Sequence, residues 1–375
     1  MQNRYLVHLK IIYFFISIAP AYAGATECNF KPHICLAQKS IFAISSFAPI
    51  ASATRIGPQT LVTSRHSVGD HRSVKIHLPG GSIINAEVIP TDFPEDLILL
   101  KAETLPKGPQ IPFGNAKANE IVRVIAIDLN KKRVKTYKPG SVIFLPSPNQ
   151  ATSRLHHTAY SQPGNSGGAL INSKGEFVGI VSSGGEGRYE AIPIKRVSTL
   201  KKRSGKPFQK SSDQIGFAVK KCTLLLEEIE YTKKSKIRRE TADTLKKICL
   251  ESKNRQLYDL AASTLGRYSF LTRSIKLFQR SILTDENAVN SRLGLIVSLS
   301  VSKKYKLAAP HIRWLLKQGI YDPQVLRLGI QTGVWGGDKG LAMEAFSVLK
   351  KTNPKLVPMV EKFLKNAYSK TKNAD

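Results

Sequence analysis

SQPGNSGGAL, residues 161–170, places Ser166 inside a run of glycines and directly ahead of an apolar segment. A phosphate-binding loop needs the pattern Gly-x4-Gly-Lys-Ser/Thr, with a strand before it and a helix after it. The lysine is absent here, and the following ALINSKGEFVGI has the composition of two strands joined by a turn. The stretch therefore predicts either a plain glycine turn or a turn that exposes a nucleophilic serine.

Two upstream segments provide the groups that a serine nucleophile needs. A serine hydroxyl attacks only when a base removes its proton and a third group orients that base. TLVTSRHSV places His66 at the end of a predicted strand, and FPEDLILLK places Asp96 directly before another. A carboxylate at the start of a buried strand is suited to orient a histidine, so we favour Asp96. The alternative carboxylates are Asp70, Asp92 and Glu95.

Residues 36–200 have the composition of an all-β domain. Short runs rich in Val, Ile, Leu and Phe, such as IVRVIAIDL and GSVIFLPS, are separated by Gly, Pro, Asn and Asp. Regularly spaced short strands of this kind are typical of a barrel or a sandwich.

In combination, these segments resemble the chymotrypsin-like serine proteases, and most closely their bacterial HtrA-type branch. LVTSRHSV resembles the histidine segment of that branch, EDLILLK its aspartate segment, SQPGNSGGALINSKGEFVGI its serine segment and YEAIPIKRV its closing strand. The resemblance implies a double β-barrel and a Ser-His-Asp triad formed by Ser166, His66 and Asp96. It also implies an oxyanion hole formed by the backbone N–H groups of Gly164 and Ser166.

The resemblance also suggests where a substrate side chain would bind. It places the walls of the specificity pocket at Tyr160, Ser161, Val181, Ser182, Ser183 and Gly184. None of these residues is acidic, so we expect a preference for small or medium apolar side chains over Lys or Arg. The chain departs from the family at residues 51–54, where ASAT replaces GSGF, and at Ala169, which replaces proline. No part of it resembles the PDZ module that usually follows this protease type.

The sequence indicates no metal or cofactor site. His156 and His157 could suggest a metal pair, but adjacent residues on a strand point to opposite faces, which disfavours shared ligation. We predict a loop or strand-surface role for them instead.

The first 23 residues have the features of a secretory signal peptide. Arg4 and Lys10 give a basic start, residues 11–18 are apolar, and Ala21-Tyr22-Ala23 is a small-x-small cleavage site. The apolar stretch is shorter than the about 20 residues that a membrane span requires, which disfavours the alternative of an uncleaved anchor. We expect cleavage near Ala23 and a periplasmic or secreted protein.

Four cysteines in an exported chain allow two disulfides. Cys28 with Cys35 would close a short loop, and Cys222 with Cys249 would join two antiparallel helices, although the spacing leaves other pairings open.

The formal net charge of +30 would attract polyanions, which makes an anionic envelope surface a candidate partner. The charge is scattered rather than gathered into a stripe, so no specific nucleic-acid partner is indicated, and a diffusely basic surface is the alternative. The basic run in residues 201–215 also contains Gly205 and Pro207, which predicts a linker.

The C-terminal part has helical periodicity, with a helical hairpin predicted over residues 216–254. A 34-residue period follows. Ser274, Ala308 and Ala342 share one repeat position, and Phe278, Ile312 and Phe346 share another. This spacing resembles that of tetratricopeptide repeats, in which a small residue permits close helix packing. An ordinary helical bundle is the alternative.

The resemblance divides residues 255–370 into three units and a capping helix. The predicted units are 255–288, 289–322 and 323–356, and the cap spans 356–368. Such an array would offer a concave surface to a peptide or protein partner.

The sequence thus predicts a signal peptide (1–23), a protease domain (24–200), a linker, a helical hairpin and helical repeats. The function that we favour is a serine endopeptidase that acts on a protein or peptide substrate through an acyl-enzyme. The alternative is a catalytically inactive, protease-like scaffold of the cell envelope. The presence of His66, Asp96 and Ser166 together favours the enzyme.

Overall fold

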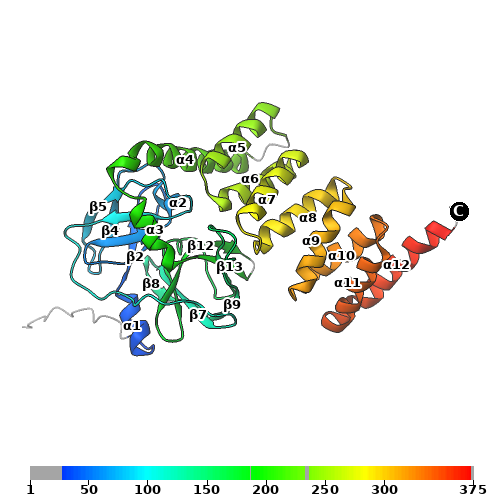
Figure 1. Cartoon of the computed structure of the whole chain (residues 1–375), viewed down its shortest axis with the longest axis horizontal. Coiled ribbons are helices and arrows are strands. Elements are labelled where there is room, and N and C mark those ends of the chain that lie inside the picture. Colours follow the sequence, from blue (N-terminus) through cyan, green and yellow to red (C-terminus); the bar gives the residue numbers. More distant parts are fainter. Residues whose placement is uncertain (1–27, 186, 233–235, 373–375) are drawn as a thin grey trace, which may run out of the picture.

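The structure, a computed structural model, describes residues 28–185, 187–232 and 236–372. The predicted signal peptide, residues 1–23, lies outside the described residues. Figure 1 shows a β-rich body at one end of the molecule and a row of helices that extends away from it to the C-terminus. None of the helices in the described ranges is long and apolar enough to cross a membrane.

The first barrel closes with the strand order β1-β2-β3-β6-β5-β4, because β1 also pairs with β4. Its strands alternate buried and exposed residues where one face meets solvent, as in β4 and β5. The strands are β1 (Ile41–Ser45), β2 (Ala51–Arg55), β3 (Thr60–Thr63), β4 (Ser73–His77), β5 (Ile83–Ile89) and β6 (Ile98–Lys101). Helix α1 (Pro32–Gln38) precedes the barrel, and the short α2 (Arg65–Val68) follows β3.

The second barrel is a seven-stranded sheet in the order β11-β12-β13-β10-β9-β7-β8, and an additional β11–β7 pairing closes six of its strands into a ring. The strands are β7 (Ile121–Asp128), β8 (Arg133–Thr136), β9 (Gly140–Phe144), β10 (Leu155–His157), β11 (Ala169–Asn172), β12 (Phe177–Gly185) and β13 (Arg188–Pro193). One apolar cluster contains Val62 and Leu97 of the first barrel and Ile125 and Ile180 of the second, so the barrels share a core. The predicted double β-barrel is confirmed.

The chain then becomes helical, and the predicted all-helical C-terminal half is also confirmed. Residues 201–215, the predicted linker, include the end of α3 (Val197–Lys202), the 3-10 turn η2 (Lys206–Phe208) and the start of α4. Helices α4 (Gln209–Thr232) and α5 (Arg239–Glu251) are joined by a disulfide between Cys222 and Cys249. A second disulfide joins Cys28 to Cys35.

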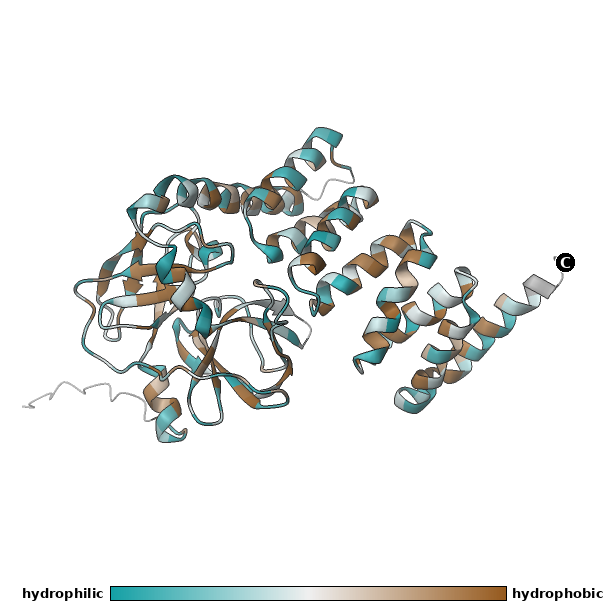
Figure 2. Cartoon of the chain, in the orientation of Figure 1, coloured by the Kyte–Doolittle hydropathy of each residue, from teal (hydrophilic) through white to brown (hydrophobic). Residues whose placement is uncertain are grey.

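Three helix pairs follow with a constant period. The first helices are α6 (Arg255–Arg267), α8 (Val289–Val301) and α10 (Pro323–Trp335), which begin 34 residues apart. The second helices are α7 (Leu271–Thr284), α9 (Tyr305–Lys317) and α11 (Lys339–Thr352), and α12 (Val357–Lys372) ends the array. Apolar residues of all these helices form one buried cluster. Figure 2 shows apolar and polar stretches alternating along each helix. Each predicted unit holds one pair, while the tetratricopeptide identity stays a prediction.

Small residues set the close packing of these pairs. Ser274, Ala308 and Ala342 are fully buried at the shared repeat position. A Cβ on Gly333 of α10 would lie 2.4 Å from the backbone nitrogen of Ala342 in α11, so glycine permits these two helices to approach this closely.

Helix α4 fastens the helical array to the first barrel beside α2 (Figure 1). A Cβ on Gly216 of α4 would lie 2.4 Å from the carbonyl oxygen of Gly69, which follows α2 directly. The ammonium of Lys220, one turn further along α4, lies 3.1 Å from the Asp70 carboxylate. The helix thus packs against the segment that follows His66.

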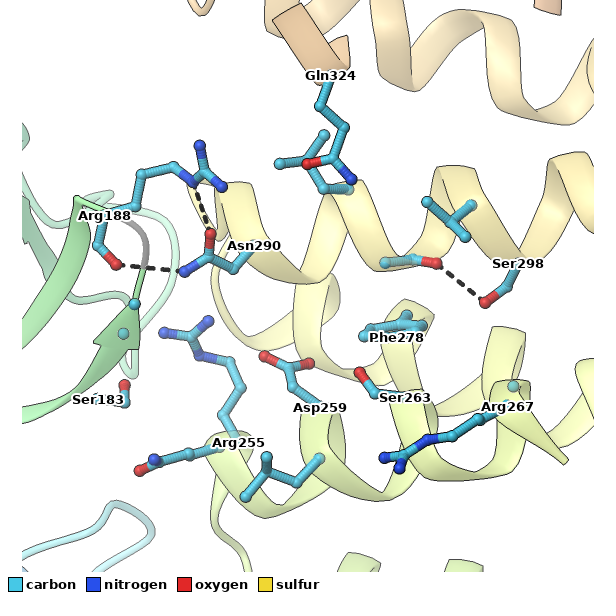
Figure 3. A pocket seen from close by; sticks show the side chains of 18 of the residues that line it. Ser183, Arg188, Arg255, Asp259, Ser263, Arg267, Phe278, Asn290, Ser298 and Gln324 are labelled. Carbon is cyan, nitrogen blue, oxygen red and sulfur yellow. Dashed lines mark hydrogen bonds between the residues drawn. The ribbon is translucent and has the colours of Figure 1, made fainter. Parts of the chain in front are cut away.

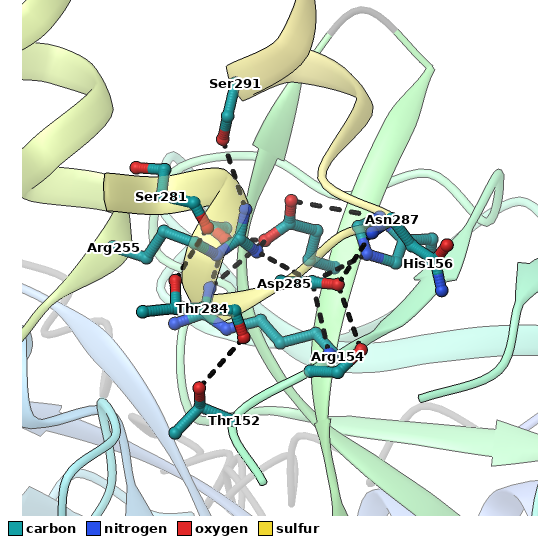
Figure 4. Close-up of polar contacts among 12 residues, drawn as sticks. Thr152, Arg154, His156, Arg255, Ser281, Thr284, Asp285, Asn287 and Ser291 are labelled. Carbon is teal, nitrogen blue, oxygen red and sulfur yellow. Dashed lines mark hydrogen bonds and ion pairs between the residues drawn. The ribbon is translucent and has the colours of Figure 1, made fainter. Parts of the chain in front are cut away.

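A buried ionic cluster fastens the array to the second barrel (Figure 4). The Glu190 carboxylate of β13 pairs with Arg154, 3.1 Å away, and with Arg255 at the start of α6. Asp285, directly after α7, accepts a hydrogen bond of 2.9 Å from Nε2 of His156 and also lies 3.5 Å from Arg255. Charges from both halves therefore neutralise one another at the junction.

The predicted surface position of the histidine pair is wrong. His156 is 4% exposed and His157 is fully buried. His156 faces the carboxylates at the junction, whereas the ring of His157 stacks on Tyr189. Burial, followed by the charge of His156, lowers the pKa of His157 to about 3, which keeps that ring neutral. Packing of the helical array against the second barrel, which the strand pattern does not reveal, accounts for the burial of His156, whereas His157 is buried beside Tyr189 of its own barrel.

Candidate active site

Strand pairing brings two of the predicted triad residues to the same end of the first barrel. Thr63, the last residue of β3, pairs with Ile98, the first of β6. His66 follows β3 within α2, and Asp96 lies just before β6. The two side chains therefore emerge side by side, with Nδ1 of His66 at 2.6 Å from Oδ2 of Asp96.

The third residue comes from the loop between β10 and β11 of the second barrel. Oγ of Ser166 lies 3.0 Å from Nε2 of His66, although the two residues are 100 positions apart in the sequence. The structure thus brings Asp96, His66 and Ser166 into one chain of hydrogen bonds at the seam between the barrels.

Asp96 is held in its ionised form. Its carboxylate is 1% exposed, and it accepts hydrogen bonds from the backbone N–H of His66 at 2.9 Å and from the hydroxyl of Ser182 at 3.1 Å. Burial raises the pKa of this carboxyl, but the charge and hydrogen bonds of His66 outweigh burial and hold the pKa below its ordinary value.

The alternative carboxylates are engaged elsewhere. Asp70 binds Lys220 of α4, Asp92 lies 2.7 Å from the guanidinium of Arg203, and Glu95 pairs with Arg196. None of the three contacts His66, and this distinguishes Asp96 from its neighbours.

The loop that carries Ser166 is bound by the segment ASAT, residues 51–54, of the first barrel. The hydroxyl of Ser52, in β2, donates to the carbonyl of Gly164 at 2.8 Å and accepts from the amide of Ile127 at 2.9 Å. Oγ1 of Thr54 donates to the carbonyl of Gly167 at 2.9 Å. The polar residues of ASAT therefore bind the loop to the first barrel.

Two glycines of this loop have a left-handed backbone. Gly164 has a φ of 89° and Gly167 a φ of 85°, and a Cβ on Gly167 would lie 2.1 Å from the carbonyl oxygen of Ser52. Glycine is thus required at position 167 by conformation and by space. The amides of Gly164 and Ser166 have no hydrogen-bond partner within the described residues, so both are available to an oxygen atom.

The buried side chain of Asn165 gives the loop its internal support. Its amide nitrogen donates to the carbonyl of Ile127 at 2.9 Å and to the hydroxyl of Tyr137 at 3.0 Å. Its oxygen accepts from the amide of Gln162 at 2.9 Å. These bonds fix the backbone directly ahead of Ser166 and bind it to the second barrel.

The six predicted pocket residues have different surroundings. Tyr160 is 44% exposed beside Tyr137 and Tyr189, and the hydroxyl of Ser161 lies 3.4 Å from Oδ1 of Asn165. The side chain of Val181 belongs to the core of the second barrel, and that of Ser182 binds Asp96.

The remaining two predicted pocket residues lie further along β12. The hydroxyl of Ser183 is bound between Arg154 at 2.6 Å and Glu190 at 2.7 Å, and Gly184 lines a groove beneath the helices. Val181, Ser182 and Ser183 thus direct their side chains into the protein.

Several residues that organise the site escape the sequence analysis. Ser52 lies in ASAT, which stands where the resemblance expects GSGF, and Glu190 is a charge within the otherwise apolar YEAIP strand. Both were visible as irregularities, but their partners are distant in sequence: Glu190 meets Arg255 across 65 residues. Their hydrogen-bond partners, and so their roles, become visible only in the folded structure.

Comparison with known proteins finds similarity to serine proteases over the barrel half of the chain. Residues 51–180 match the family model of the trypsin-like peptidase domain. The serine protease Do-like HtrA of Lactobacillus helveticus is 30% identical over 181 residues, which cover 44% of this chain and 44% of that protein. The serine endoprotease DegS of Haemophilus influenzae is 31% identical over 147 residues, which cover 36% and 43%.

The chain spans less than half the length of these curated relatives. A solved serine endoprotease from Yersinia pestis has 22% sequence identity and a TM-score of 0.40, with 45% of this chain and 64% of that chain covered. The family match ends at residue 180, ahead of the helical array.

Proposed function

We propose that this protein is a serine endopeptidase that hydrolyses peptide bonds through an acyl-enzyme on Ser166. The observation that carries the proposal is the chain of hydrogen bonds from the Asp96 carboxylate through the imidazole of His66 to the Ser166 hydroxyl. Burial keeps Asp96 from water, and its carboxylate contacts only protein groups that the structure describes: His66 and the hydroxyl of Ser182.

The reaction follows from these contacts. Nε2 of His66 accepts the hydroxyl proton as Oγ of Ser166 bonds to the carbonyl carbon of the substrate, and Asp96 stabilises the resulting imidazolium. The amides of Gly164 and Ser166 bind the negative oxygen, each contributing on the order of 3 kcal/mol to transition-state stabilisation. His66 then protonates the leaving amine as the C–N bond breaks. Water, deprotonated by the same imidazole, hydrolyses the ester.

The substrate main chain would bind along β12. Strand β11 pairs with β12 only as far as Ile180, and residues 183–185 pair with β13 alone among the described residues. Their other edge is open, and an extended peptide can add to such an edge as a further strand.

The protein would act outside the cytosol. Two disulfides persist in an oxidising compartment, which agrees with the signal peptide expected at the N-terminus. We propose the protease domain as residues 24–200 and tetratricopeptide-like repeats over 255–370 that dock a substrate or partner.

An activity-based fluorophosphonate tests the assignment. We expect it to label the wild-type protein and to leave Ser166→Ala unlabelled, because only an activated serine reacts. Thermal unfolding of both proteins shows that each is folded. If folded wild-type protein is not labelled, the enzyme assignment fails and the inactive scaffold takes its place.

A further inference from the structure

We propose that the concave face of the first helix pairs binds the substrate segment that precedes the scissile bond and leads it along β12 to Ser166. This inference rests on the proposed peptidase function and adds the part of the substrate that the helices recognise.

A groove of about 630 Å³ lies between the second barrel and the helical array. One face of α6 lines it with Gln256, Asp259, Leu260 and Ser263, and one face of α8 lines it with Asn290, Leu293, Gly294 and Val297. Gln324 reaches in from α10 (Figure 3). The barrel contributes the end of β12, residues 183–185.

Strand β12 connects this groove to the nucleophile. The carbonyl oxygen of Ser182 lies 3.4 Å from Oγ of Ser166, and Gly185, three residues later, already lines the groove. Three strand residues span about 10 Å. A peptide held at Ser166 therefore enters the groove after about three residues.

The direction of the peptide follows from the sheet. Every strand pairing of the second barrel is antiparallel. A strand added to the open edge in the same manner runs opposite to β12, from Gly185 toward Ser182. Its N-terminal part then lies in the groove and its carbonyl carbon reaches Ser166, so the groove receives the residues upstream of the cleaved bond.

The groove offers a repeated amide for binding the peptide backbone. Gln256, Asn290 and Gln324 occupy the same position of successive helix pairs, 34 residues apart. Asn290 is held by Arg188, which donates to its oxygen at 2.7 Å and accepts from its nitrogen at 3.2 Å. The side-chain amides of Gln256 and Gln324 have no hydrogen-bond partner within the described part of the chain, and the backbone N–H of Gln256 is bound by Asn254. A side-chain amide both donates and accepts, and it therefore matches the N–H and C=O groups of an extended backbone.

Apolar side chains flank these amides. Leu260 is 48% exposed and Val297 is 38% exposed, one on each helix face that forms the groove. The ligand class that this surface fits is an extended polypeptide with apolar side chains, recognised mainly through its backbone.

The test compares two peptides with identical residues around the scissile bond. One has about three residues upstream, enough to cover the edge of β12, and the other has about ten, enough to fill the groove. We expect L260D and V297D each to lower kcat/KM for the long peptide about tenfold and to leave that for the short peptide unchanged. Leu307→Asp is the matched control, because Leu307 is 59% exposed on α9 and does not line the groove.

Fluorophosphonate labelling separates the two proposals. Wild-type protein that is labelled but cleaves both peptides equally well, or groove variants that affect both peptides alike, would overturn the groove proposal and leave the peptidase intact. Absence of labelling of the folded wild-type protein would contradict the proposed peptidase function. A dependence on residues downstream of the scissile bond would also contradict the proposed direction.

Discussion

In the barrel half, His66 and Ser166 are 100 residues apart in sequence and yet share a hydrogen bond of 3.0 Å. In the helical half, each pair packs on its sequence neighbour, and the pattern returns after 34 residues. The site in the barrels therefore depends on a few long-range contacts, whereas the array distributes its stability over many similar ones. Equivalent substitutions in the two halves should have unequal effects.

The largest difference is expected between two histidines. Substituting His66→Ala removes the base and should lower turnover about a millionfold. Substituting His311→Ala, a half-buried residue of α9 that contacts Arg292, should leave turnover unchanged. Peptide hydrolysis by the two purified variants measures this. Comparable losses in both variants would mean that the helical array takes part in the chemistry, contrary to a catalytic site confined to the barrels.

Two glycines extend the comparison to stability. Gly167 has a φ of 85° and faces the carbonyl of Ser52, so Gly167→Ala combines backbone strain with a collision and should cost about 4 kcal/mol. Gly337 follows α10 with a φ of 74° and open space around it, so Gly337→Ala should cost about 1 kcal/mol. Chemical denaturation gives both values. An equal cost would show that the loop around Ser166 relaxes freely.

The contrast between local patterns and long-range contacts explains which features could be predicted from the sequence. The segments around His66, Asp96 and Ser166 each carry a local pattern, and the helical period is local by nature, so the double barrel, the helix pairs and the triad candidates all follow from short stretches. Hydrogen bonds between residues far apart in the sequence could not be predicted. Ser52 donates to Gly164, 112 residues later, and no pattern near Ser52 indicates that partner.

The buried contacts between the barrel half and the helical half were also not predicted, because their partners are distant in sequence. The sequence predicts a surface position for His156, but the helical array packs against the second barrel and places Asp285 and Arg255 beside it. Their burial depends on how two domains meet, and periodicity within one domain carries no information about that.

The two disulfides differ in loop length, one in each half. Replacing both Cys222 and Cys249 by alanine opens a loop of 27 residues separation and should lower the free energy of unfolding by about 3.5 kcal/mol. The pair Cys28 and Cys35, with a separation of 7, should cost about 2.5 kcal/mol. Denaturation of the two double variants tests the order. A larger loss from the short loop would show that native packing around the bridges, rather than chain entropy, decides their value.

Acid should weaken the junction between the halves. Burial raises the pKa of Glu190, but the charges of Arg255, His156 and Arg154 outweigh burial and lower it to about 2. The unfolded chain then binds more protons than the folded one, so the contribution of Glu190 is complete above about pH 4.5 and is lost as the pH falls toward 2. Denaturation at several acidic pH values should show stability declining over this window.

The variant Glu190→Gln supplies the control for the acid effect. It should be less stable at neutral pH, because the buried arginines lose a counter-charge, and its stability should depend less on pH below 4.5. An unchanged slope would assign the acid sensitivity to other carboxylates.

The smallest expected effect compares two neighbouring serines. The hydroxyl of Ser182 donates to the Asp96 carboxylate at 3.1 Å, so Ser182→Ala removes one hydrogen bond to a charged group and should lower kcat about tenfold. Ser183→Ala removes a hydroxyl from the next residue, which binds Arg154 and Glu190 instead, and should leave kcat almost unchanged. Equal losses in the two variants would point to a disturbance of β12 as a whole. A loss confined to Ser182→Ala would show that the backbone N–H of His66 alone does not orient Asp96 and that the Ser182 hydroxyl is also required, as expected of a site built from few contacts.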